Sequence, residues 1–183
     1  MKIIVGLGNP GDNYRRTRHN AGWIFLDALT AGETWKENKK FSALICETNS
    51  AIIVKPLTYM NESGISVRKI MDFYGLLPKR LGLFGKKDAD LTEVLTVVQD
   101  ELDVDFGKIK TATDSGSAGH RGIESIISHL QTKKFKRLRL GIKNEFLKTR
   151  IPPEKFVLQN FSQQEQEMLK DLFSKFQTKN PLI

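Results

Sequence analysis

The sequence of 183 residues contains a single cysteine, Cys46, and no long run of apolar residues. A lone cysteine excludes an intramolecular disulfide, and because Cys46 lies in an alternating apolar segment, we expect it to be buried in the core. No apolar stretch is long enough to cross a bilayer, which excludes a membrane-spanning protein. The first stretch, residues 3–5, is too short for a signal peptide, so we expect a cytoplasmic protein with no membrane partner.

Acidic residues are also scarce relative to basic ones. The chain has 29 Lys and Arg against 21 Asp and Glu, a formal charge of +8, and a sequence pI near 9.6. Such an excess indicates an anionic partner, with nucleic acid the first candidate, although a basic surface without a partner is the alternative. The apolar content of 39% is typical of a globular protein and excludes disorder. The length predicts one domain, spanning residues 1–183.

Apolar patterns predict strands that alternate with helices. Strands are expected at residues 3–5, 41–48, 51–54 and 94–99, with a polar edge strand at 108–113 and a half-exposed strand at 137–142. Helices are expected at residues 20–31, at 61–74 with Phe73 facing inward, around 123–130, and after a capping box formed by Ser162 and Glu165. Residues 77–93 predict a surface loop. This order predicts an α/β fold: a single domain with a mixed, twisted β-sheet flanked by helices.

A glycine-rich loop follows the first predicted strand. Residues 6–11 read Gly-Leu-Gly-Asn-Pro-Gly, which matches the dinucleotide-binding pattern G-x-G-x-x-G. That pattern requires a helix to begin at the loop, but no apolar periodicity appears before Asn20. A second interpretation places the loop at the carboxyl end of a strand, where the side-chain amide of Asn9 would face a ligand cleft. The third interpretation is a turn without a ligand, because Asn-Pro-Gly favours turns.

One of the three histidines is a candidate catalytic base. His19 lies in a polar loop beyond the glycine-rich segment, and imidazole is the commonest general base near neutral pH. Its second ring nitrogen needs a carboxylate partner. Asp100, at the end of a buried strand, is the best candidate, with Glu101 and Asp103 as alternatives.

The remaining histidines and the rest of the sequence give no sign of a metal or of a covalent nucleophile. The spacing of His120 and His129 does not fit a zinc site, and His129 is expected on the surface. No G-x-S-x-G pattern is present, so a hydrolytic reaction would use activated water.

Several motifs together resemble the bacterial-type peptidyl-tRNA hydrolase family over nearly the whole chain. The resemblance rests on Gly6–Gly11, Thr17–Gly22, Lys55–Gly64, Asp100–Asp103, Gly119–Gly122, Arg137–Arg139 and Val157–Ser162. It implies a monomeric α/β enzyme without metal or organic cofactor. The implied reaction is hydrolysis of the ester between a peptide and the 3′-terminal ribose of tRNA, which recycles tRNA lost from ribosomes as peptidyl-tRNA.

The resemblance also implies roles for individual residues. His19 matches the catalytic base and Asp100 the carboxylate that orients it. The implied cleft residues are Asn9 and Asn61, whose amides hold the peptide and the ester, Met60, an apolar wall, and Tyr14, an aromatic near the 3′ end of the tRNA. Arg139 matches a basic residue that holds the tRNA 5′ phosphate.

Two residues depart from the family pattern. Arg121 stands where the family has an asparagine of the site, and we expect it to meet substrate phosphate or carbonyl groups or to turn away. Ala112 stands where a phosphate-binding lysine is common, and the nearby Lys108 and Lys110 are the expected substitutes. Lys133, Lys134 and Arg137 are further candidate phosphate contacts. Residues 81–92 also look longer than the usual connection.

These departures keep a second hypothesis open, in which the chain is a non-catalytic RNA-binding protein of the same fold. A dinucleotide-dependent oxidoreductase is the third and depends on the glycine-rich loop alone.

Overall fold

The computed structural model describes residues 1–78, 87–145, 147 and 151–179. They form a mixed sheet of seven strands with helices on both faces, which confirms the predicted fold class. The strands are β1 (Lys2–Gly6), β2 (Lys36–Asn38), β3 (Ala43–Glu47), β4 (Ala51–Pro56), β5 (Leu95–Asp105), β6 (Ile109–Ala112) and β7 (Lys136–Lys143). The α-helices are α1 (Ala21–Leu29), α2 (Ser63–Phe73), α3 (Arg121–Leu130), α4 (Pro153–Phe156) and α5 (Gln163–Lys179).

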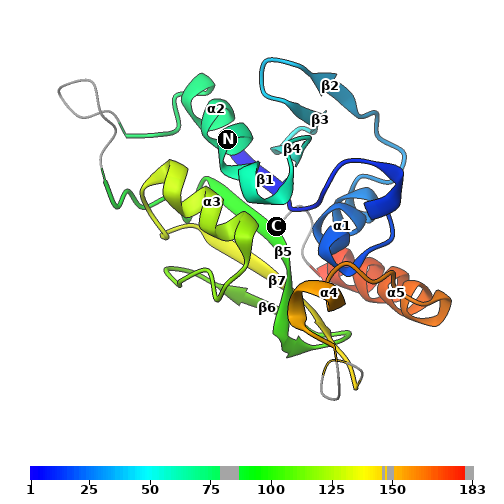
Figure 1. The fold of residues 1–183 in the computed structure, drawn as a ribbon. Helices are drawn as coiled ribbons and strands as arrows, with labels where there is room; N and C mark the ends of the chain where they lie inside the picture. Colours follow the sequence, from blue (N-terminus) through cyan, green and yellow to red (C-terminus); the bar gives the residue numbers. More distant parts are fainter. Residues whose placement is uncertain (79–86, 146, 148–150, 180–183) are drawn as a thin grey trace.

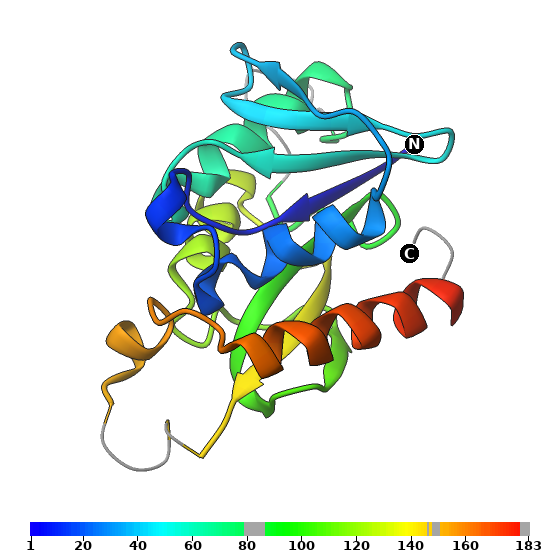
Figure 2. The ribbon, with the colours of Figure 1, turned by 90° about the vertical axis from the view of Figure 1, so that its right-hand side faces the viewer.

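The strand order β2-β3-β4-β1-β5-β7-β6 puts β1 near the centre of the sheet. β1 pairs in parallel with β4 and β5, and β5 pairs in parallel with β7, whereas the outer pairings are antiparallel. The carboxyl ends of these parallel strands therefore meet at one edge. Helices α2 and α3 cover one face of the sheet, and α1 and α5 cover the other (Figures 1 and 2).

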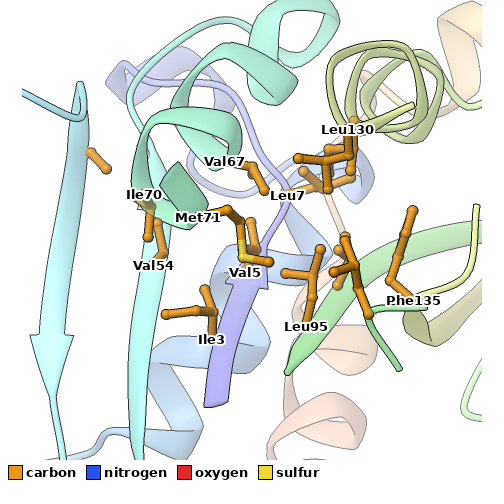
Figure 3. Close-up of a cluster of buried hydrophobic side chains, with 14 of the residues drawn as sticks. Ile3, Val5, Leu7, Val54, Val67, Ile70, Met71, Leu95, Leu130 and Phe135 are labelled. Atoms are coloured by element: carbon orange, nitrogen blue, oxygen red, sulfur yellow. The ribbon is translucent and has the colours of Figure 1, made fainter. Parts of the chain in front are cut away.

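Alternation along β1 divides the core into two layers. Ile3 and Val5 point to the α2–α3 side, where they pack with Met71 and Leu95 (Figure 3). Ile4 points to the opposite side and packs in the layer under α1 and α5. Side chains of both layers are almost completely withdrawn from water. Burial of each aliphatic side chain of this kind stabilises the fold by about 1.5–3 kcal/mol relative to an exposed one. Because its side chains enter both layers, β1 contributes to both.

Most predicted elements are present, with shifted ends. The expected edge strand is β6, Ser162 and Glu165 form the capping box of α5, and Cys46 is buried. The short strand β2 and the helix α4 were not predicted, because the former has no apolar alternation and the latter has a single turn. No helix in the described part of the chain is both long and apolar enough to span a membrane.

Three predictions about exposure were wrong. β7 is largely buried and not half-exposed, because Leu138 and Leu140 pack in the layer under α1 and α5 while Arg137, on the other face, donates to the loop at Gly116. Phe73 is 55% exposed and packs edge-on against other aromatic rings. The second half of the predicted surface loop is docked: Ala89 and Leu91 are buried in the α2–α3 layer. Residues 79–86 of that loop lie outside the described residues.

Glycines let helix α1 approach the ends of β1 and β5 closely. A Cβ atom on Gly22 would lie 2.5 Å from the carbonyl oxygen of Val98 and 2.6 Å from the backbone nitrogen of Leu7. Gly6 and Gly8 are equally crowded, by Leu26 and Trp23 respectively. These glycines therefore serve helix packing around the loop that carries Asn9.

We predict that Gly22→Ala lowers the free energy of unfolding by about 1–3 kcal/mol, because the added methyl group meets backbone atoms that cannot rotate away. Urea unfolding followed by circular dichroism measures this. Gly116→Ala is the matched control, since a Cβ there meets nothing within 4 Å. Equal losses in the two variants would contradict the prediction.

Candidate active site

A cleft of about 580 Å³ lies at the carboxyl ends of the central parallel strands. The loop after β1 contributes Asn9, the loop and 3₁₀ turn after β4 contribute Met60 and Asn61, and β5 contributes Asp100. In open α/β sheets ligands bind outside these strand ends. The cleft lining brings together all the catalytic and substrate-binding residues predicted from the sequence: Asn9, Tyr14, His19, Met60, Asn61, Asp100 and Arg121.

At the base of the cleft His19 is paired with Asp100. Nδ1 of His19 lies 2.9 Å from Oδ1 and 3.1 Å from Oδ2 of the carboxylate. The two alternative partners are placed elsewhere: Glu101 faces Arg139, and Asp103 is exposed. The ionised carboxylate accepts a hydrogen bond from the N–H group at Nδ1, so in the neutral ring the other nitrogen, Nε2, carries no proton. No described group bonds this nitrogen.

A second histidine, which the sequence did not single out for this site, holds the same carboxylate. Nε2 of His120 lies 3.0 Å from Oδ1 of Asp100, and the two imidazole rings are 5.0 Å apart. His120 also caps helix α3, because its Nδ1 accepts from the backbone N–H groups of Gly122 and Ile123 at 3.2 and 3.4 Å. The cap therefore fixes the proton on Nε2, which donates to Asp100.

His19, Asp100 and His120 also form a group whose possible ligand atoms lie within 4.8 Å of one another. A metal on Nε2 of His120 would need the proton moved to Nδ1, where it would face the two backbone N–H groups of the helix cap. That conflict disfavours a metal at this atom. The arrangement fits a carboxylate shared by two imidazoles.

The surroundings of His19 shift its basicity in opposite directions. Burial lowers the pKa of His19, the charge of Asp100 and its hydrogen bond raise it, and the nearby charge of Arg121 lowers it. The net pKa lies above the usual 6.5. Asp100 is 2% exposed, and although burial raises its pKa, the charges and hydrogen bonds of the two histidines hold that pKa far below its usual range. The carboxylate thus stays ionised.

The side chain of Asn9 is oriented by backbone groups. Its Oδ1 accepts from the N–H of Met60 at 2.8 Å, and Asn20 bonds both the N–H and the carbonyl of Asn9. The Nδ2 group of Asn9 is consequently the side that remains as a donor toward the cleft. Asn61 is exposed beside it at the rim.

The predicted phosphate-binding residues differ in their exposure and in their partners within the protein. Lys110 and Arg139 are direct partners across β6 and β7, so their side chains share one face, where Nη2 of Arg139 donates to Ser115 at 2.7 Å. Lys108 is exposed and paired with Asp105. Arg137 is 1% exposed and donates to the carbonyl of Gly116. It therefore holds the loop at Gly116 and is not available to a phosphate, so its predicted phosphate contact was wrong. Lys133 and Lys134 also have acidic partners.

Comparison with known proteins identifies the family. The sequence model of the peptidyl-tRNA hydrolases matches residues 3–182. The chain belongs to the peptidyl-tRNA hydrolase family. It is 38% identical over 182 residues to the peptidyl-tRNA hydrolase of Mycoplasma mycoides, covering 94% of this chain and 87% of the relative. It is 41% identical over 169 residues to that of Mycobacterium ulcerans, covering 89% and 80%.

A crystal structure of the peptidyl-tRNA hydrolase from Acinetobacter baumannii has a TM-score of 0.81 and 32% sequence identity, and the match covers 100% of this chain and 87% of that chain. The chain is therefore a hydrolase of this family, with its fold.

The dinucleotide hypothesis has no structural support, because a 3₁₀ turn, Asp12–Tyr14, follows the glycine-rich loop where a long helix would have to begin.

We predict that Asp100→Asn brings the pKa of His19 from above 6.5 to below it. The variant removes the charge that raises this pKa, while burial and Arg121, which lower it, remain. Titration of the His19 ring by NMR measures the change. His129→Gln is the control, because His129 is an exposed imidazole on α3. An unchanged His19 titration in Asp100→Asn would contradict the assignment of the pair.

Proposed function

We propose that this chain hydrolyses the ester bond between the peptide and the 3′-terminal ribose of peptidyl-tRNA, with His19 as the general base. The observation that carries the proposal is the placement of His19. Its Nδ1 is held by the buried Asp100, and its Nε2 has no partner among the described residues and lines the cleft. A base in this state can remove a proton from water beside a bound ester. The reaction releases free tRNA from peptidyl-tRNA that has left the ribosome, and this tRNA can then be used again.

In the proposed reaction Nε2 of His19 takes a proton as the water oxygen adds to the ester carbonyl. The resulting imidazolium is stabilised by Asp100, which remains ionised because its pKa is so low. His120 keeps the carboxylate in place through its own hydrogen bond. His19 then returns the proton to the departing ribose oxygen. General-base assistance of this kind contributes about 10²–10⁴-fold in rate.

The other cleft residues bind the substrate. The Nδ2 group of Asn9 donates to a carbonyl of the peptide or ester, and Asn61 offers both a donor and an acceptor at the rim. Met60, which is 4% exposed, supplies an apolar wall. Tyr14 is half-buried in the lining and contacts the 3′ end of the tRNA.

The tRNA phosphates are bound on the face formed by β6 and β7. Lys110 and Arg139 lie on neighbouring strands and supply two cations there, in place of the lysine absent at Ala112. Lys108 adds a third, since an exposed ion pair such as that with Asp105 is worth little and exchanges readily. Phosphate contacts carry no sequence information, as suits an enzyme that accepts many tRNAs. We also propose that the protein acts as a monomer in the cytoplasm, as the family resemblance and the sequence lead one to expect.

We predict that His19→Ala lowers kcat on an N-acetylated aminoacyl-tRNA by about 10²–10⁴-fold while tRNA binding persists, because the base is lost and the phosphate contacts remain. Steady-state hydrolysis and a filter-binding titration measure the two quantities. His129→Ala controls for loss of an exposed histidine and keeps full activity. An inactive natural protein that still binds tRNA would instead support the RNA-binding hypothesis.

We predict that Arg139→Ala weakens tRNA binding and lowers the slope of log K against log salt by about one. The variant removes one phosphate contact, and the number of such contacts sets the slope. Lys170→Ala is the control, because Lys170 is an exposed cation on α5, on the opposite face of the sheet. If both variants keep the natural slope, Arg139 does not bind phosphate.

A further inference from the structure

Arg121 is the first residue of α3 and follows directly after His120, whose ring contacts His19. Its side chain is exposed and lines the cleft together with His19 and Asn9. No described carboxylate forms an ion pair with its guanidinium. A cation thus lies at the cleft, near enough to His19 for its charge to act on that ring, and no hydrogen bond or ion pair among the described residues involves it.

The family resemblance leads one to expect an asparagine at this position. An asparagine amide both donates and accepts and carries no charge, whereas a guanidinium only donates and stays protonated at any pH at which the protein is folded. The substitution therefore changes what the cleft can stabilise. An amide suits a neutral carbonyl or a water molecule, and a guanidinium suits a group that carries or gains negative charge.

The acidic groups around the cleft do not neutralise the charge of Arg121. On the floor, the negative charge of Asp100 is held by His19 and His120. Glu101, also on β5, is paired with Arg139, and Glu154 on α4 is exposed and also lines the cleft. The titratable rings of Tyr14 and Tyr59 complete the lining. Arg121 is thus the cation of the described lining that is not engaged with a protein carboxylate.

We propose that the guanidinium of Arg121 donates to the carbonyl oxygen of the scissile ester and stabilises the negative charge that this oxygen gains. The inference depends on the hydrolysis proposed above. When water adds, its oxygen bonds to the carbonyl carbon, the carbonyl electron pair moves onto the carbonyl oxygen, and the proton goes to His19. Collapse returns the electron pair, breaks the bond to the ribose oxygen and sends the proton there. Arg121 only donates hydrogen bonds and exchanges no proton in either step.

Two measurable consequences follow. Negative charge on the oxygen exists only after water has added, so Arg121 favours the transition state over the bound substrate and acts on kcat more than on KM. Loss of one such donor lowers kcat by about 10²–10³-fold. Because the same charge lowers the pKa of His19, its removal also raises that pKa and moves the acidic limb of the pH profile to higher pH.

The experiment compares Arg121→Met and Arg121→Lys with the natural protein on an N-acetylated aminoacyl-tRNA. We expect Arg121→Met to lower kcat by about 10²–10³-fold on the alkaline plateau, to leave KM nearly unchanged, and to shift the acidic limb upward. Arg121→Lys keeps the charge, so the limb stays in place and kcat is partly restored. Lys69→Met, which removes an exposed cation from α2, is the control and leaves all three quantities unchanged.

A second arm separates the ester oxygen from a tRNA phosphate as the group that Arg121 meets. The substrate is a phosphate-free 3′-O-(N-acetylaminoacyl)adenosine, used at high enzyme concentration. An equal loss on both substrates supports the ester oxygen, as does recovery of Arg121→Ala by added guanidinium ion. Loss on tRNA alone, expressed in KM, assigns Arg121 to a phosphate and overturns the proposal, and natural kinetics in Arg121→Met overturn it outright. Either result leaves the His19 mechanism standing if His19→Ala is inactive.

Discussion

The buried charge of Asp100 determines how the rest of the site is arranged. A carboxylate that is 2% exposed costs several kcal/mol unless it is paired and hydrogen-bonded. Two imidazoles meet this requirement, and each is constrained as a result: His19 must carry its proton on Nδ1, and His120 must carry its proton on Nε2. The first constraint leaves Nε2 of His19 as a base. The second frees Nδ1 of His120 to cap α3, and this cap sets Arg121 at the start of the helix beside the cleft.

The loop that carries His19 is held by distant parts of the chain. The backbone N–H groups of Arg18 and His19 donate to the carbonyls of Gln159 and Val157 at 2.9 and 2.8 Å. The buried guanidinium of Arg18 donates to Glu165 at 2.9 Å and lies over the ring of Phe156. Glu165 also closes the capping box of α5, so the helix start, the ion pair and the catalytic loop share one carboxylate. A precise base position therefore depends on contacts between residues almost 150 positions apart.

Local patterns predicted the fold class and the strands that carry the site, because each buried strand has an apolar or β-branched run of its own. The pair of His19 and Asp100 could also be predicted, since a histidine in a polar loop and a carboxylate at the end of a buried strand are both recognisable in a sequence. The role of His120 could not, because its bond to Asp100 depends on how the Gly/Ser-rich loop before α3 folds back over the end of β5, which no local pattern reveals. The burial of Arg137 was missed for a similar reason: the loop at Gly116 covers its side chain, and the alternation within β7 does not reveal this contact.

The balance of charges on His19 explains why an arginine can be accommodated beside it. A general base works best when its pKa is close to the operating pH, since a higher value leaves it protonated and a lower value makes it a weak acceptor. Asp100 raises the pKa of His19 in two ways, through its charge and through its hydrogen bond. A cation on the other side offsets part of that increase without breaking the pair, because Arg121 lines the cleft and does not compete for the carboxylate. An uncharged amide at this position would leave the increase in place, so the charge of Arg121 keeps more of His19 neutral and able to accept a proton.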